Sequence, residues 1–294
     1  MHHDRPILQS LPRVDALGSR QFLLDLIPEL RVVPSAIRPL RLADTSVCAP
    51  PKRFRALDVG AGIGRVTADV LLHLVSDVVL LEPVPSFIDE AHRRCQGTST
   101  SDEGNLSGWS GIRDGTKSVS FFRGPLQDFD PSQPNRDTEE LQRLGYIPSD
   151  DDVNLGFDVV WCQWCLGHLN DEDLVAFLKR SAAALRGPRS LIVVKENLCS
   201  EKKAPRTEFD EQDSSWTRYV RMVHVAGFCC SQYHRSDLAF KKIFEDADLH
   251  LVRQKIQHGL PAGLYPVKMY VADNLARQRF TDRTSYRYAL RPNL

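Results

Sequence analysis

The fold is decided by the stretch Ala56-Leu57-Asp58-Val59-Gly60-Ala61-Gly62-Ile63-Gly64-Arg65-Val66-Thr67. Its first four residues read as a short buried strand, and the apolar positions from Val66 onward fit one face of a helix. The alternate glycines let the backbone turn sharply and place no side chain between the turn and a ligand. The N-terminus of the helix adds unpaired N–H groups and partial positive charge. Together these features predict a nucleoside-binding site.

The spacing of the glycines and of the next acidic residue indicates which nucleoside is bound. Glu82 lies 22 positions after Gly60, where a carboxylate can accept hydrogen bonds from ribose hydroxyls. A dinucleotide fingerprint requires Gly or Ala at position 65, where this chain has Arg65. The G-x-G-x-G spacing after Asp58 resembles the first motif of S-adenosylmethionine-dependent methyltransferases. In that interpretation Gly60 and Gly62 approach the cofactor and Arg65 holds its methionine carboxylate; an ordinary glycine-rich turn is the alternative.

Composition limits the class of protein. The chain has 294 residues, 42% of them apolar, enough for one large domain with appendages. Lys+Arg and Asp+Glu are each 38, so the zero net charge predicts neither a direct nucleic-acid partner nor a membrane partner. No apolar run approaches the ~18 residues of a membrane span, and the polar start has no signal-peptide core. Seven cysteines, an odd number, indicate reduced buried thiols in an intracellular protein without a metal site. We expect a cytoplasmic location that extends to the nucleus.

The order of elements predicts an α/β fold with a doubly wound, mostly parallel sheet. Residues 1–55 are expected to form an N-terminal helix, starting at Asp15 or Ser19, and a proline-rich strap. Residues 56–294 form the second unit, with polar insertions near 97–117, 130–155 and 271–287. Ser86 and Asn170 are expected N-caps of two of its helices. The last strand is expected near residues 264–271.

Ligands of such a sheet lie at the carboxyl ends of the strands. The third predicted strand is followed by Leu126 and Gln127, where an adenine edge is commonly read, although Gln127 could be a solvated loop amide. The fourth is followed by Gln163-Trp164-Cys165-Leu166-Gly167-His168, and the fifth ends in Lys195-Glu196-Asn197. These loops are expected on one rim with the glycine turn.

These blocks closely resemble those of the α-N-terminal protein methyltransferases, over roughly residues 8 to 270 outside the insertions. The W-x-x-G-H-L block, Trp164 to Leu169, is the most specific of them. The resemblance implies a Rossmann-like class I methyltransferase fold with a seven-stranded sheet and S-adenosylmethionine as cofactor. It implies as substrates the N-terminal tails of proteins, of the ribosomal or chromatin type, that begin X-Pro-Lys or X-Pro-Arg.

The resemblance also implies roles for single residues. Gln163 contacts the cofactor, Trp164 the substrate and His168 the amine, and Asn197 matches the family's asparagine after strand five. The family's D-x-x-D-S-S segment falls on residues 210–215, where the second acid is the base and the first reads the basic third residue of the substrate. This assigns Asp213 as the base, Asp210 and Ser215 to substrate binding, and Tyr265 to the family's tyrosine near the last strand.

The chemistry explains these residue types. An α-amino group has a pKa of ~7.7–8.0, so most of it is protonated at neutral pH and a general base must remove that proton. Asp213 and His168 are the candidates, while Asn197 could hold the peptide backbone and Trp164 offers a flat wall for a proline ring. Asp213 could instead be only a helix N-cap, and His168 an ordinary loop histidine.

Other functions stay open at this point. Cys162 and Cys165 form a C-x-x-C pair, which suggests redox or zinc chemistry in other contexts. A small-molecule N-methyltransferase and an inactive cofactor-binding interaction protein are the two rival functions. The second is prompted by the start MHHDRP, which does not match the family's N-terminal lid. Residues 271–287 look like an insertion that splits the last strand, and we expect both departures to reflect an alternative or mispredicted gene model.

Overall fold

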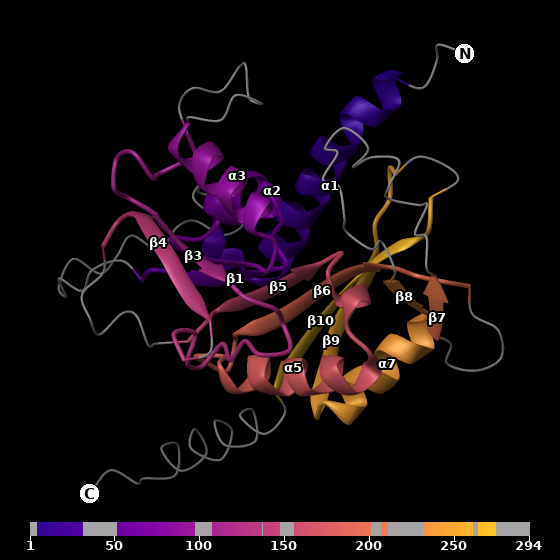
Figure 1. Ribbon diagram of the computed structural model, residues 1–294. Helices are drawn as coiled ribbons and strands as arrows, with labels where there is room; N and C mark the ends of the chain where they lie inside the picture. Colours follow the sequence, from indigo (N-terminus) through magenta and orange to yellow (C-terminus); the bar gives the residue numbers. More distant parts are fainter. Residues whose placement is uncertain are drawn as a thin grey trace, which may run out of the picture.

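The glycine-rich stretch joins β1 (Arg55–Val59) to α2 (Arg65–Asp69) at the centre of an eight-stranded sheet. The computed structural model describes residues 5–31, 52–97, 108–136, 138–147, 156–200, 207–210, 232–260 and 264–274. The strand order is β4-β3-β2-β1-β5-β6-β10-β9, so the order reverses beside β1 (Figure 1). In open α/β sheets, ligands bind in the crevice at such a switch point.

The central strands are parallel and the outer ones antiparallel. β2 (Asp77–Glu82), β3 (Ser118–Arg123), β5 (Val159–Gln163) and β6 (Leu191–Asn197) run parallel to β1. β10 (Val267–Asn274) pairs antiparallel with both β6 and β9 (Leu249–Ile256), and β4 (Glu139–Gly145) pairs antiparallel with β3. A separate two-stranded sheet consists of β7 (Thr207–Asp210) and β8 (Gln232–Arg235).

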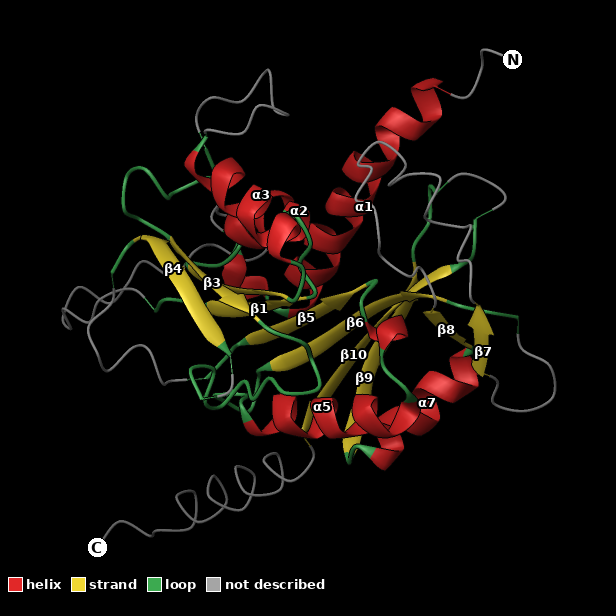
Figure 2. Cartoon of the chain, viewed as in Figure 1, coloured by secondary structure: helices red, strands yellow, loops and turns green. Residues whose placement is uncertain are grey.

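Helices cover both faces of the large sheet (Figure 2). One face carries α1 (Arg5–Leu26), α2, the short helix η2 (Leu71–His73) and α3 (Pro85–Gln96). The other carries α5 (Asp171–Ala183) and α7 (Asp237–Asp246). Two further single turns are η1 (Pro28–Leu30) and η3 (Leu166–His168).

Each face of the sheet forms its own core because strand side chains alternate between faces. In β1, Ala56 packs with α1 and α2, whereas Leu57 and Val59 pack with α5 and α7. The central strands are buried on both faces, as expected for parallel strands covered by helices on both sides. This rigid centre fixes the carboxyl ends of β1, β2, β5 and β6.

The α/β class, the mostly parallel sheet and the helices on both faces are confirmed, and several local expectations are wrong. The sheet has eight described strands instead of seven, because β4 lies inside the polar segment 130–155. α1 begins at Arg5, so Asp15 and Ser19 lie within the helix and do not start it. The N-cap of α3 is Val84 and not Ser86, whereas the side chain of Asn170 does cap α5 by accepting from the N–H of Asp173.

Two further segments differ from expectation. Trp109, in the supposed surface insertion 97–117, is 8% exposed and packs in the core beside Phe121 of β3. β10 runs from Val267 to Asn274, so the strand is not interrupted at residue 271, and residues 275–287 lie outside the described part of the chain.

Candidate active site

The glycine turn occupies the carboxyl end of β1. Gly60, Gly62 and Gly64 have φ of 59°, 57° and 78°, in the left-handed region that favours glycine. A Cβ on Gly60 would lie 2.4 Å from the Cβ of Cys165, so the turn packs directly against the Gln163–His168 loop. A Cβ on Gly62 would meet nothing within 4 Å. The turn is therefore closed on the protein side and open where Gly62 faces outward.

Glu82, at the carboxyl end of β2, is tied to the glycine turn. One carboxylate oxygen accepts from the N–H of Gly62 at 2.8 Å and the other from the N–H of Val84 at 3.0 Å. Burial raises the pKa of Glu82, and these two backbone hydrogen bonds oppose that rise. A carboxylate has about four acceptor positions, so two remain for ribose hydroxyls.

Asp58, also near the end of β1, supports the helix that follows the turn. It is buried and accepts a hydrogen bond from the hydroxyl of Thr67 at 2.6 Å. Burial raises the pKa of Asp58 to about 7. Asp58 thus acts beneath the turn rather than at its surface.

The Gln163–His168 loop lies at the end of β5 in an unusual backbone conformation. Trp164 has φ of 55°, which is rare for a residue other than glycine. Its N–H donates to the carbonyl of Lys195, and the N–H groups of Cys165 and Leu166 donate to one carboxylate oxygen of Glu196, at 2.9 and 3.0 Å. β6 therefore determines the shape of this loop.

A fully buried arginine holds the same loop from the other side. Arg235, the last residue of β8, donates to the carbonyl oxygens of Leu166 at 3.1 Å and Leu169 at 2.6 Å. It also forms an ion pair with Asp171 at the start of α5. His168 is exposed within this supported turn, as a group that must reach a substrate requires.

The predicted cofactor residues Arg65 and Gln163 come together on the carboxylate of Asp15, which projects from α1. Arg65 binds it at 2.7 Å and the side-chain amide nitrogen of Gln163 at 2.9 Å. The fully buried Lys195 forms a third contact. Burial opposes ionisation of Asp15, but the charges of Lys195 and Arg65 outweigh it and lower the pKa of Asp15. The ring of Trp164 lies near both cations, with its centroid 5.4 Å from the Arg65 guanidinium carbon and 5.8 Å from Lys195 Nζ.

The loop after β3 is anchored from α5. Arg180 donates to the backbone carbonyls of Leu126 at 2.8 Å and Gln127 at 2.9 Å. Leu126 is buried and Gln127 is exposed, which suits an apolar contact to an adenine face and a polar contact to its edge.

The remaining predicted residues lie around β6, β8 and β10. Asn197, 8% exposed, ends β6 and pairs with Val267. Tyr265 stacks on the ring of the buried His234 with centroids 5.0 Å apart. Asp210 is the last residue of β7, where its backbone pairs with Gln232. Asp213 and Ser215 lie outside the described residues, so their predicted roles stay predictions.

The C-x-x-C pair does not form a reactive thiol site. Cys162 and Cys165 are both buried, and burial raises the pKa of each thiol well above its usual range. A thiolate is the form that attacks disulfides and binds metals. Within the described ranges, no group of His, Cys, Asp or Glu has a metal-binding arrangement.

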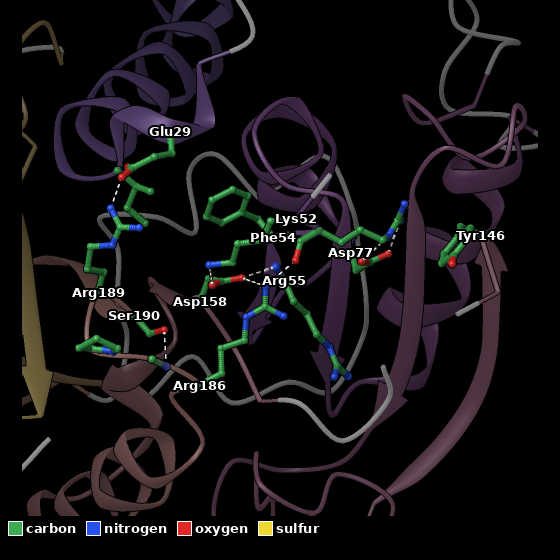
Figure 3. Close-up of a pocket in the computed structure, with 14 residues that line it drawn as sticks. Glu29, Lys52, Phe54, Arg55, Asp77, Tyr146, Asp158, Arg186, Arg189 and Ser190 are labelled. Carbon is green, nitrogen blue, oxygen red and sulfur yellow. Dashed lines mark hydrogen bonds and ion pairs between the residues drawn. The ribbon is translucent and has the colours of Figure 1, made fainter. Parts of the chain in front are cut away.

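A cavity of about 700 Å³ lies at the opposite edge of the sheet, where the strands begin (Figure 3). Three acidic side chains of its lining pair with basic ones: Arg53 pairs with Asp77 at 2.6 Å, Asp158 pairs with Arg186 at 2.5 Å and with Lys52 at 3.0 Å, and Glu29 pairs with Arg189. Because the lining holds five basic and three acidic side chains, it keeps an excess of positive charge. It is remote from the glycine turn, so it is not the cofactor site.

Four residues that shape the site were not assigned roles in it from the sequence: Asp15, Trp109, Glu196 and Arg235. Trp109 closes the glycine turn, because a Cβ on Gly64 would lie 2.2 Å from its ring. The only sequence signal for Glu196 was its place between Lys195 and Asn197. Asp15 and Arg235 gave no such signal, since buried charges become recognisable only when their partners are known.

Three features of the rim fit S-adenosylmethionine. There is open space at Gly62, and Glu82 has spare acceptor positions. Arg65 and Lys195 together carry one positive charge more than the Asp15 carboxylate neutralises. Together with the strand order, these features define a class I, AdoMet-dependent methyltransferase. The chain belongs to the family described as AdoMet-dependent proline di-methyltransferases, whose model matches residues 8–226 and 229–273.

Named relatives agree with this assignment. The chain is 33% identical over 260 residues to an alpha N-terminal protein methyltransferase 1 of Schizosaccharomyces pombe, covering 88% of this chain and 82% of that one. It is 31% identical over 212 residues to an N-terminal Xaa-Pro-Lys N-methyltransferase 1 of Danio rerio, covering 72% and 69%. The fold matches a SAM-dependent methyltransferase of Leishmania major with a TM-score of 0.53 at 24% identity, over 90% of this chain and 73% of that one. None of the helices in the described ranges has both the length and the hydropathy needed to cross a lipid bilayer.

Proposed function

We propose that this enzyme methylates the free α-amino group of proteins whose N-terminus reads X-Pro-Lys or X-Pro-Arg. The observation that carries the proposal is the packing of the glycine turn against the Gln163–His168 loop, at the point where Gly60 meets Cys165. This packing puts the cofactor-side turn next to Trp164 and His168. The names of the relatives support the choice of a protein N-terminus as substrate.

The reaction requires little covalent chemistry from the protein. When bound, S-adenosylmethionine supplies a methyl group on a sulfonium that leaves as a neutral thioether. The chain must hold the amine in line with that methyl group and accept the proton that the amine loses, so positioning and general-base catalysis account for the rate. We assign Asp213 as the general base that accepts this proton, with His168 as the second candidate. Asn197 is assigned to hold the peptide backbone.

Substrate contacts follow from the same rim. Trp164 offers a flat apolar wall to a proline ring and a π face to a methylated, cationic amine. Asp210 is assigned to the basic third residue, and Ser215 and Tyr265 to the peptide. Gly60, Gly62, Arg65, Glu82, Leu126, Gln127 and Gln163 are assigned to the cofactor.

A peptide assay tests the proposal. The enzyme is incubated with methyl-labelled cofactor and a Ser-Pro-Lys peptide, with the α-acetylated peptide as the control. Label should appear on the free α-amine and not on the acetylated peptide. Equal labelling of both would refute the proposal, and equal labelling of a Ser-Ala-Lys peptide would indicate a less selective N-methyltransferase.

A variant tests the base. Asp213→Asn should lower turnover about a hundredfold, the usual contribution of one general base, while the Kd for S-adenosylhomocysteine stays unchanged. Asp210→Asn is the matched control, because it should raise KM for the Lys-containing peptide more than it lowers kcat. Unchanged turnover in Asp213→Asn would exclude this residue as the base.

We further propose a cytoplasmic location, extending to the nucleus, where ribosomal and chromatin proteins expose such N-termini. Fractionation of cells that express the tagged chain would test the location. Recovery with a membrane fraction would contradict it.

A further inference from the structure

One fully buried carboxylate, that of Asp15 on α1, contacts three elements of the rim at once. It accepts from Arg65 at the start of α2 and from Gln163 at the end of β5, at 2.7 and 2.9 Å. It also pairs with Lys195 in β6. Since α2, β5 and β6 meet at the switch point of the sheet, α1 is fastened to the cofactor side of the rim.

We propose that Asp15 is a positioning residue of the cofactor site, which orients Arg65 and Gln163 toward the methionine carboxylate and makes α1 a part of that site. The proposal rests on the cofactor roles assigned above to Arg65 and Gln163. It does not depend on the peptide substrate.

The charges around Asp15 support this role. Two cations, Arg65 and Lys195, face one carboxylate, which leaves an excess of one positive charge at the rim. Lys195 has no exposed surface and also donates to the hydroxyl of Ser19 at 2.9 Å and to the side chain of Gln257 at 3.2 Å. The Arg65 side chain is 29% exposed, so it is the cation that a ligand can reach.

The geometry of the two partners also suits a second carboxylate. Arg65 uses one terminal nitrogen for Asp15, and a guanidinium has five donors in a planar fork, so its other edge can bind a ligand at the same time. The amide of Gln163 is fixed at both ends: its oxygen accepts from the indole of Trp161 at 3.1 Å and its nitrogen donates to Asp15. Asp15 therefore sets the orientation of both groups before a ligand arrives.

Binding calorimetry with two ligands tests the proposal. S-Adenosylhomocysteine carries the amino-acid carboxylate, and 5′-methylthioadenosine has the same nucleoside and thioether but lacks that carboxylate. Asp15→Asn should raise the Kd for S-adenosylhomocysteine about tenfold, the effect of one charge-assisted hydrogen bond. It should change the Kd for 5′-methylthioadenosine less than about twofold. An unchanged or lower Kd for S-adenosylhomocysteine would overturn the proposal.

Arg65→Met separates this proposal from the assignment of the cofactor site. If Arg65→Met weakens S-adenosylhomocysteine selectively and Asp15→Asn does not, Asp15 is only structural and the inference fails. If Arg65→Met does not weaken the binding of S-adenosylhomocysteine more than that of 5′-methylthioadenosine, the assigned carboxylate site is itself wrong. Neither result bears on the peptide assay, which needs no knowledge of Asp15.

Two further variants guard against loss of folding. Asp158→Asn removes the charge of another buried aspartate, which pairs with Lys52 and Arg186 at the opposite edge of the sheet, so it should lower Tm without changing either Kd. In Asp15→Asn, the buried ammonium of Lys195 loses its carboxylate partner. The double variant Asp15→Asn/Lys195→Met removes that ammonium as well. It should regain Tm relative to Asp15→Asn and still bind S-adenosylhomocysteine about tenfold more weakly than the wild type. Wild-type affinity in the double variant would overturn the proposal.

Discussion

Replacing Glu196 with glutamine would measure the charge state of the carboxyl group that shapes the Gln163–His168 loop. One oxygen of Glu196 accepts from both Cys165 and Leu166, so the amide oxygen of glutamine can accept the same two hydrogen bonds. The substitution therefore removes the titration while it keeps the loop contacts. Burial raises the pKa of Glu196 from 4.5 to about 7, whereas in the unfolded chain it returns to its ordinary value.

The magnitude follows from the two pKa values. At pH values between these two pKa values, the folded protein binds about one proton more than the unfolded chain. The free energy of unfolding therefore falls as pH rises toward 7. From pH 5 to pH 8 the wild type should lose about 2.5 kcal/mol through Glu196. Glu196→Gln lacks this loss. Asp58, whose pKa is also raised to about 7, titrates in both proteins and cancels in the difference.

The assay is urea-induced unfolding of both proteins at pH 5, 6, 7 and 8 and constant ionic strength. The wild type minus Glu196→Gln difference in unfolding free energy should fall by about 2.5 kcal/mol over this range, with most of the change below pH 7. Parallel curves, within about 0.5 kcal/mol, would refute the reasoning, because they would mean that Glu196 is ionised throughout in the folded protein.

Three further predictions concern the turn and the loop beside it. Gly62→Ala should cost about 1 kcal/mol of stability, because Gly62 has a positive φ. It should also raise the Kd for S-adenosylhomocysteine at least about tenfold, because the new methyl group enters the open space of the turn. Unchanged affinity would place the cofactor elsewhere. Gly60→Ala, whose Cβ would meet Cys165 at 2.4 Å, should instead lower the unfolding free energy by about 3 kcal/mol, as urea unfolding would measure. Arg235→Met should cost about 3 kcal/mol, because two buried loop carbonyls lose their charged donor; a loss below about 1 kcal/mol in urea unfolding would contradict the support assigned to it.

The centre of the fold could be predicted from the sequence because its signals agree with one another. The strand before Gly60, the apolar strand before the Gln163–His168 loop and the N-cap Asn170 each have a local cause, in periodicity or capping. The structure confirms all three, and the second is β5, which runs from Val159 to Gln163. The rim followed from those strands, since the carboxyl ends of parallel strands share one edge of a sheet.

The periphery was less predictable for physical reasons. β4 is an edge strand whose side chains are exposed or half-buried, so it carries no apolar alternation. Trp109 stands in a run of Ser, Gly and Thr, and only packing against Phe121 brings it into the core. Asp15 resembles a helix cap in the sequence. Its neighbours in the chain do not reveal that it is buried against Lys195, which lies 180 residues away.

That long separation has a consequence for how the enzyme becomes competent. The ion pair between Asp15 and Lys195 joins positions 180 residues apart, and contacts of this kind form slowly because a large loop must close first. α1 is made early during synthesis, and Arg65 and Gln163 follow it, but the buried ion pair of its carboxylate with Lys195 cannot form until β6 has emerged from the ribosome. Affinity for the methyl donor should therefore arise among the last steps of maturation, after the central strands have already paired.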